Sequence, residues 1–238
     1  MGSEDLFHKR KAKAKQQLER KSKLRSPYDN VLIVVEGEKT EKDYLNALID
    51  KYKINTANFE VVGKGEGPMS IVSTAVQKYD QAYASPNRFD QVFCVFDRDS
   101  FGDFNDAVDL CASKNSDVIN NMVDSGEKPE EGREYFKAIT SNPCFEYWVL
   151  LHLNYTDKGY SATGNRSICG KVVDDIKALI GTYEKGSITN LDFLFEDDCI
   201  AAAIKNSERA LSQTLESGSQ TYTLVHEVVI YMQSLSKD

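Results

Sequence analysis

Acidic side chains follow three predicted buried strands of this 238-residue chain, directly where each strand ends. Because the carboxyl ends of parallel strands converge at one edge of an α/β sheet, these carboxylates are expected to meet there. Ionised carboxylates brought together repel one another and favour a cation, and Mg²⁺ is a hard ion that prefers oxygen ligands. The spacing therefore predicts a Mg²⁺ site. The acids are Glu36, Asp97, Asp99 and Glu146.

The stretch "IVVEGEKTEKDYL" (33–45) holds three glutamates that are not equivalent. Glu36 lies at a strand end beside a glycine that lets a ligand approach, so it is the first candidate ligand. Glu41 is the second candidate, and Glu38 is expected to be a charged turn residue. A simpler reading is that Glu38 or Glu41 only favours the positive end of the following helix. Likewise, Arg98 could pair with either aspartate of the "DRD" segment.

Glu146 differs from the other acids because it lies inside an apolar segment, between aromatic residues. An unpaired carboxylate there would be costly, so a metal ion or a Lys or Arg partner is expected. Lys185, in "GTYEKGS", could face a phosphate or be a surface lysine. Lys64 lies in the glycine-rich segment "GKGEGP" (63–68), whose backbone NH groups could approach a phosphate, although a plain loop also explains it.

The histidines and cysteines point to no second type of chemistry. His152 lies in an apolar helix and is expected to be a hydrogen-bonded core residue, while His8 and His226 have no supporting cluster. The five cysteines form no CxxC pair, so we expect reduced thiols in a cytosolic protein rather than a disulfide or zinc framework. The cysteines are Cys94, Cys111, Cys144, Cys169 and Cys199.

The elements that must position these residues alternate between strand and helix, which predicts a parallel sheet covered on both faces. Apolar runs and turn signals place the strands at 31–35, 59–62, 91–96 and 136–139. One helix is expected to have Thr40 as its N-cap, a second to hold Pro68 in its first turn, and a third to hold Pro143 in its first position. Further helices are expected over about 104–112, 171–183, 197–215 and 222–235. The polar segment from 113 to 132 is expected to be a mobile loop.

Charge divides the chain into a basic arm at residues 1–27 and an acidic body at 28–238, which is expected to be one domain with a helical C-terminal part. Residues 1–26 hold nine Lys and Arg against three Asp and Glu, a net charge of +6, and the remainder carries −14. Such an arm either contacts a polyanion or the body itself, or is a solvated tail. The candidate nucleic-acid-binding residues are Lys9, Arg10, Lys11, Lys13, Lys15 and Lys64.

Nothing in the sequence indicates a membrane protein or a secreted one. No apolar run approaches the roughly 20 residues that a membrane helix needs, and the N-terminus is basic without a following apolar stretch. A cytoplasmic location is therefore expected.

The combination of a strand followed by Glu-Gly with a later strand followed by DxD resembles the Toprim domains of topoisomerases, primases and OLD-family nucleases. Within that group the chain resembles the RloB-like family, collinearly over about residues 28–235. The "SNPCFE" block is the most specific part of the resemblance. The matching stretches are 31–45, 61–68, 93–101, 141–153 and, more weakly, 182–186.

The resemblance implies a Toprim/Rossmann-like fold and phosphodiester chemistry that depends on Mg²⁺ or Mn²⁺. By position, Glu36 is the Toprim glutamate, and Asp97 and Asp99 form the DxD pair. Glu41 matches the acid that closes the "EGxTE" pattern of OLD-type nucleases, but "EGEKTE" has one extra residue, which leaves Glu38 open as well. Glu146 and Lys185 are implied as further catalytic residues.

The function implied is a metal-dependent nuclease that cuts DNA or RNA, acting as the effector of a prokaryotic anti-phage or restriction-associated system. RloB-like proteins often accompany an ATPase, and this chain has no GxxxxGK[ST] loop of its own, so the ATPase would be a separate partner. The alternative is a non-cleaving Toprim-like subunit that binds or regulates that partner. Phosphoryl transfer on a small molecule fits the same carboxylates but lacks a recognisable base pocket.

Overall fold

A computed structural model describes residues 29–54, 59–63, 67–85, 87–98, 102–162, 166–188, 191–218 and 220–236. The basic arm, with its candidate nucleic-acid-binding residues, lies outside the described residues, as do Lys64 and Asp99. The roles assigned to them above, and the division of the chain near residue 27, stay predictions.

The centre of the fold is a five-stranded sheet with the order β2-β1-β3-β4-β5. Its strands are β1 (Val31–Val35), β2 (Phe59–Gly63), β3 (Gln91–Asp97), β4 (Phe136–Asn142) and β5 (Tyr222–Thr223). The first four are parallel, and the two-residue β5 pairs antiparallel with β4. The expected α/β fold, consistent with a Toprim/Rossmann-like architecture, is confirmed.

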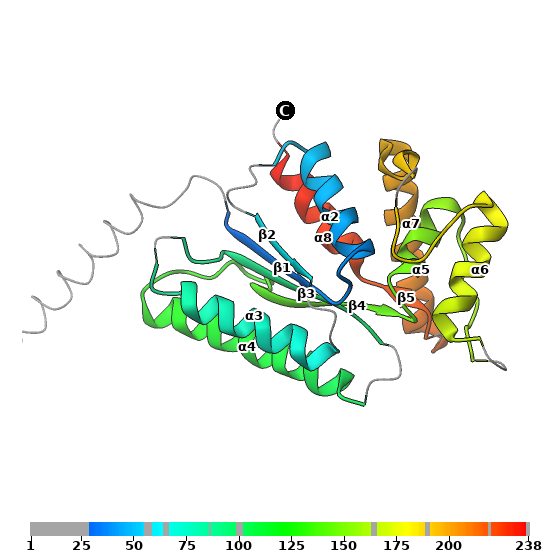
Figure 1. Ribbon diagram of the computed structural model, residues 1–238. Helices are drawn as coiled ribbons and strands as arrows, with labels where there is room; N and C mark the ends of the chain where they lie inside the picture. The colour runs from blue at the N-terminus through cyan, green and yellow to red at the C-terminus, as the bar shows by residue number, and fades with distance from the viewer. Residues whose placement is uncertain are drawn as a thin grey trace, which may run out of the picture.

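Seven helices flank the sheet in the described part of the chain, and Figure 1 shows α3 and α4 on one face and α2 and α8 on the other. Helices α5, α6 and α7 gather beyond β4 and β5 and form the helical C-terminal part. None of the helices described is long and apolar enough to cross a membrane. The helices are α2 (Thr40–Lys51), α3 (Pro68–Ala82), α4 (Phe104–Asp124), α5 (Glu146–Leu153), α6 (Ile168–Ile180), α7 (Asp197–Ser217) and α8 (Val225–Leu235), with a 3₁₀ turn, η2, at Asp192–Phe195.

Strand β1 is apolar throughout because both of its faces are covered. Successive side chains of a strand point to opposite faces of the sheet. Val31, Ile33 and Val35 therefore pack in the core under α2 and α8, whereas Leu32 and Val34 pack in the core under α3 and α4. All five are fully buried, which fixes the central strand and the position of its carboxyl end.

Helix α4 is longer than the sequence predicted. A short helix over 104–112 followed by a mobile loop was expected, but the helix continues to Asp124. Phe104, Ala107, Cys111 and Val118 are buried at helical spacing against the sheet. The many Asp, Asn and Ser residues between them form the solvent-facing side, and they obscured the helical period in the sequence.

Three predicted helix starts are displaced. The helix expected from about 222 begins at Val225, because Tyr222 and Thr223 form strand β5 against β4. Pro143 was expected at the first helical position, but α5 begins at Glu146, and Pro143 follows a cis peptide bond. Strand β4 continues to Asn142 because its end pairs with β5, so the helix starts later. Thr40 was expected as the N-cap of α2 but is its first helical residue.

His152 is a core residue with both ring nitrogens hydrogen-bonded, as expected. Its Nδ1 lies 2.9 Å from the carbonyl oxygen of Trp148 and must donate to it. Its Nε2 therefore accepts from the Tyr44 hydroxyl at 3.0 Å. Burial, which disfavours the charged ring, lowers the pKa of His152 to about 4, although its backbone hydrogen bond opposes the shift.

Acid should consequently destabilise the fold through His152. The ring takes up its proton near pH 6.5 in the unfolded chain but only near pH 4 in the folded chain, so stability falls as pH drops through this window. At pH 4 the free energy of unfolding should be about 3 kcal/mol lower than at neutral pH. Urea unfolding gives the difference in free energy of unfolding between the wild type and His152→Gln at each pH. The variant's deficit at pH 7 should be smaller at pH 4 by about 3 kcal/mol. A deficit that does not vary with pH would contradict it.

Candidate functional site

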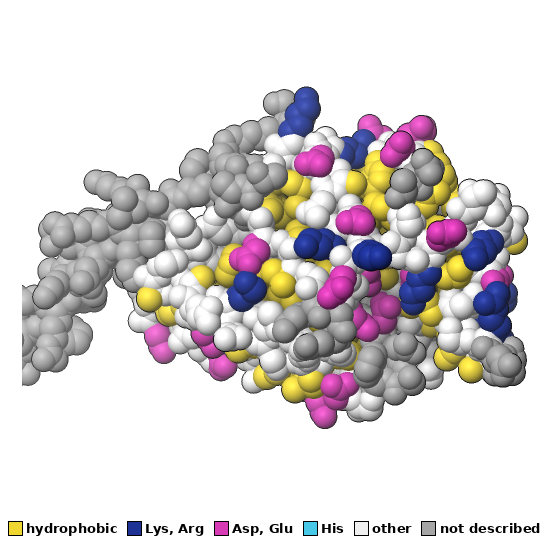
Figure 2. Space-filling view, in the orientation of Figure 1, with side chains coloured by type: hydrophobic (Ala, Val, Ile, Leu, Met, Phe, Trp, Pro, Cys, Tyr) yellow, Lys and Arg dark blue, Asp and Glu magenta, His cyan; other side chains and the backbone are white. Residues whose placement is uncertain are grey.

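A cleft of about 490 Å³ opens at the edge of the sheet where β1, β3 and β4 end. Its walls come from the β1–α2 turn, the end of β3, the turn into α5, the start of α6 and the loop that follows α6. Figure 2 shows acidic and basic side chains intermixed near the centre of one face of the molecule. The sequence-predicted residues that line the cleft are Glu36, Glu41, Asp97, Glu146 and Lys185.

Glu36 joins the ends of β1 and β3. Its backbone NH donates to the carbonyl oxygen of Val95 at 3.0 Å, and its side-chain Oε2 accepts from the backbone NH of Asp97 at 3.1 Å. This contact follows from the parallel register, in which Val35 lies opposite Val95. The two acids that the sequence placed at separate strand ends therefore lie side by side.

Asp97 is partly buried among other carboxyl groups. Burial raises the pKa of Asp97 well above its usual range, and the negative charges of Glu41, Glu146 and Glu36 raise it further. A hydrogen bond from the backbone of Phe145 opposes the shift. Among the described residues, the neighbouring negative charges therefore disfavour the charged form of Asp97.

Glu41, in the first turn of α2, is 8 % exposed and also lies in this group. Burial raises the pKa of Glu41 to about 7, and repulsion by Glu146 and Glu36 contributes, against its own backbone hydrogen bond and Lys185. Glu38 is exposed at the rim of the same cleft. Glu41, rather than Glu38, thus lies among the buried carboxyl groups of the cleft.

Gly37 is where the Glu41 carboxylate approaches the backbone. A Cβ atom placed on Gly37 would lie 1.7 Å from Glu41 Oε2. The sequence suggested that this glycine lets a ligand approach Glu36. In the structure, the Glu41 side chain of the protein itself occupies the space beside Gly37.

Glu146 and Lys185 also come together, although 39 positions separate them in the sequence. Glu146 is 3 % exposed, and its Oε2 lies 4.0 Å from Lys185 Nζ. Burial raises the pKa of Glu146, and Lys185 partly offsets this. The expected cation partner of Glu146 is thus present, with a largely exposed side chain that faces the cleft.

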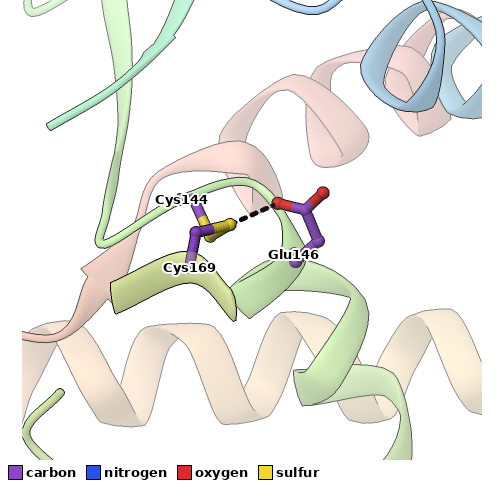
Figure 3. Close-up of side chains that lie close together, drawn as sticks. All are labelled: Cys144, Glu146 and Cys169. Carbon is purple, nitrogen blue, oxygen red and sulfur yellow. Dashed lines mark hydrogen bonds between the residues drawn. A yellow bond between two sulfur atoms is a disulfide. The ribbon is translucent and has the colours of Figure 1, made fainter. Parts of the chain in front are cut away.

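Cys144 and Cys169 form a disulfide in the cleft wall, so the expectation of five reduced thiols is wrong for this pair. Cys144 precedes α5 and Cys169 lies in the first turn of α6. Figure 3 shows them beside Glu146, whose Oε2 lies 3.1 Å from Cys169 Sγ. The pair has no sequence spacing motif, because it depends on how α5 packs against α6. Cys94, Cys111 and Cys199 are free.

Reduction of this disulfide should lower the stability of the fold. The bridge joins residues 25 positions apart and restricts the unfolded chain, which is worth about 3 kcal/mol. For a chain of this size the melting temperature should then fall by roughly 10 °C on reduction. Differential scanning calorimetry with and without a phosphine reductant measures this. Cys169→Ser should melt at the same temperature in both conditions; an equal shift in the variant would show that another group responds.

Tyr183 is a residue of this region that the sequence reasoning missed. It is 1 % exposed, and its hydroxyl has no hydrogen-bond partner among the residues described. Burial raises the pKa of Tyr183, and the charges of Glu146 and Glu41 raise it further, so the phenol lies close to both acids. The available signal was its place in "TYEKG" (182–186), immediately before the candidate Lys185.

The fold and the cleft define an α/β protein with an acidic site at the carboxyl edge of a parallel sheet. The chain belongs to the RloB-like protein family, whose family model matches residues 31–232. The match runs from β1 into α8 and so includes every segment that lines the cleft. Neither the curated proteins nor the solved structures contain a match to this chain.

Proposed function

We propose that this protein is a nuclease that hydrolyses phosphodiester bonds of DNA or RNA with Mg²⁺ or Mn²⁺. The observation that carries the proposal is the convergence of Glu36, Glu41 and Asp97 in one cleft, where the pKa values of Glu41 and Asp97 are raised by burial and by neighbouring carboxylates. Negative charge outweighs positive charge among these residues, although Lys185 also lines the cleft. A divalent cation is what would allow all three groups to ionise together.

The donor atoms of this part of the cleft fit a hard cation, since they are carboxylate oxygens. Glu36 and Asp97 would hold it, with Asp99 added by the family resemblance and Glu41 as a further ligand. When bound, the cation would act as a Lewis acid and activate a water molecule. The Asp97 backbone NH holds Glu36 Oε2 at the strand end, which limits the freedom of that carboxylate.

Two other side chains would act on the substrate directly. The exposed Lys185 ammonium would neutralise non-bridging phosphate oxygens as charge develops on them. Glu146 is buried, which raises its pKa, the direction that favours a general-acid role toward the leaving oxygen. The basic arm would grip the nucleic-acid backbone, offsetting repulsion by the acidic body.

The biological setting belongs to the same proposal. We infer that the protein is the effector of a prokaryotic anti-phage or restriction-associated system, that it works with an ATPase partner, and that its catalytic chemistry is of the Toprim type. The resemblance to Toprim and OLD-family nucleases in the Glu-Gly and DxD segments supports this inference, as does membership of the RloB-like family.

A cleavage assay on pools of DNA and RNA tests the proposal. Purified protein should cut at least one pool when Mg²⁺ or Mn²⁺ is added and should not cut in the presence of a chelator. Asp97→Ala should remove the metal-dependent cutting. If Asp97→Ala cuts as well as the wild type, the site assignment fails. If a protein that binds metal cuts neither pool, with or without its ATPase partner, the protein is a binding subunit instead.

Gly37→Ala should weaken metal binding without affecting the rest of the fold. The new Cβ would force the Glu41 carboxylate out of its place, and displacing a ligand in this way should reduce Mn²⁺ affinity roughly tenfold. Isothermal titration with Mn²⁺ measures the change. Gly159→Ala is the matched control because a Cβ there meets nothing within 4 Å. Equal affinities for the two variants would argue against Glu41 as a ligand.

A further inference from the structure

One wall of the cleft carries a different set of ligand atoms from the rest. Cys144, Glu146 and Cys169 offer two sulfurs and a carboxylate oxygen, all within 4.8 Å of one another. Among the described residues, no other group of three or more His, Cys, Asp or Glu side chains has its ligand atoms this close together. We propose that, when the two cysteines are reduced, these three side chains bind a thiophilic divalent cation such as Zn²⁺. This inference does not rest on the nuclease proposal.

The positions of the three side chains suit a tetrahedral ion. Zn²⁺ binds thiolate sulfur at about 2.3 Å and carboxylate oxygen at about 2.0–2.2 Å, which puts neighbouring ligand atoms roughly 3.5–4 Å apart. The Cα atoms of Cys144 and Cys169 are 5.9 Å apart, and Cys169 Sγ already lies 3.1 Å from Glu146 Oε2. The two sulfurs need only separate after reduction, and Glu146 need hardly move.

The charges around the group also balance. Two thiolates and one carboxylate carry −3, which Zn²⁺ would reduce to −1. Lys185 Nζ lies 3.3 Å from Cys169 Sγ and 4.0 Å from Glu146 Oε2, so its ammonium group would neutralise the remainder and donate to the thiolate. Without a cation, reduced Cys169 and the nearly buried Glu146 would have to share this one exposed lysine.

Sulfur ligands make this site chemically distinct from the carboxylates across the cleft. Thiolates favour Zn²⁺, whereas an all-oxygen set favours Mg²⁺ or Mn²⁺. Three protein ligands leave a fourth position of the tetrahedron for water or another small ligand. Because Cys144, Glu146 and Cys169 all line the cleft, that position would be accessible from it.

Zinc binding and the disulfide exclude each other. A dithiol reductant would attack the Cys144–Cys169 bond and transfer two electrons to it, leaving two protein thiols and one disulfide in the reductant. Zn²⁺ would then displace the two thiol protons as it binds the sulfurs. The oxidised protein should bind no zinc at this site, so its capacity for zinc depends on its redox state.

Metal titration of the wild-type protein in both redox states tests the proposal. Protein treated with a dithiol, desalted without oxygen and titrated with Co²⁺ should develop a sulfur-to-cobalt charge-transfer band. One equivalent of Zn²⁺ should abolish the band, and a large excess of Mg²⁺ should not. Oxidised protein should give no band. A reduced protein without the band, or an oxidised protein with an equal band, would overturn the proposal without any mutation.

Variants then locate the site. Cys144→Ser and Cys169→Ser should each weaken Zn²⁺ binding by the reduced protein by at least roughly tenfold, with circular dichroism confirming that they fold. Glu146→Gln should weaken Zn²⁺ binding while retaining the charge-transfer band. Cys199→Ser, which alters a free cysteine in α7, should bind as the wild type does. If Cys199→Ser loses the band and both other serine variants retain it, the zinc lies elsewhere.

Discussion

Glu36→Gln is expected to lower metal-dependent cleavage by at least about a hundredfold while leaving the fold intact. The amide oxygen of glutamine can still accept the hydrogen bond that Asp97 NH donates to Glu36 Oε2 in the wild type. The strand ends therefore stay joined, and the change removes only the negative charge. The rate of substrate cleavage under single-turnover conditions, at saturating Mg²⁺, measures the effect.

The matched control for this substitution is Glu131→Gln. Glu131 is an exposed acid in the turn between α4 and β4 and takes no part in the cleft. The Glu131→Gln protein should cut at the wild-type rate, and both variants should have the wild-type melting temperature. A Glu36→Gln protein with undiminished cleavage would mean that this glutamate is an ordinary charged residue of the turn.

Glu41→Gln is expected to have opposite effects on stability and on metal binding. The folded-state pKa of Glu41, about 7, lies above its ordinary value of 4.5, so the folded protein loses stability as pH rises through this window. At pH 8 the ionised, buried carboxylate costs the metal-free fold about 2 kcal/mol or more, a cost that glutamine removes. The variant should therefore melt several degrees higher without metal and gain less stability from added Mg²⁺.

Thermal unfolding at pH 5 and pH 8, with a chelator present, isolates this effect. The stability gain of Glu41→Gln over the wild type should be clear at pH 8 and small at pH 5. Glu38→Gln is the control, because Glu38 is exposed at the rim of the same cleft and should change little at either pH. A Glu41→Gln protein that melts lower than the wild type at pH 8 would contradict the crowded-carboxylate account.

The sheet and the meeting of the strand-end acids were predictable because they depend on local patterns. The run Val31–Val35 favours a strand buried on both faces, and parallel strands bring their carboxyl ends to one edge of the sheet. That was enough to expect Glu36 and Asp97 at the same edge, and the pairing of β1 with β3 in the structure places them next to each other. Glu146 was identifiable from its apolar surroundings alone, and its proximity to the other acids followed from the same edge of the sheet.

The remaining features depend on tertiary contacts that no local pattern records. The disulfide forms because helix α5 packs against α6, which brings Cys144 to Cys169 across an intervening loop. The burial of Tyr183 beside the acids depends on the loop after α6. Helix α4 was underestimated because a polar composition was given more weight than the four widely spaced apolar residues that face the sheet.

Direct measurement of Mn²⁺ binding tests the central claim, that the carboxylates of this cleft form a site for a hard divalent cation. Free Mn²⁺ can be counted by electron paramagnetic resonance as it is titrated into oxidised wild-type protein and into Asp97→Asn. The wild type should bind Mn²⁺ at a saturable site from which Mg²⁺ displaces it, and Asp97→Asn should lose that site while retaining its fold. Equal Mn²⁺ binding by the two proteins would contradict the account.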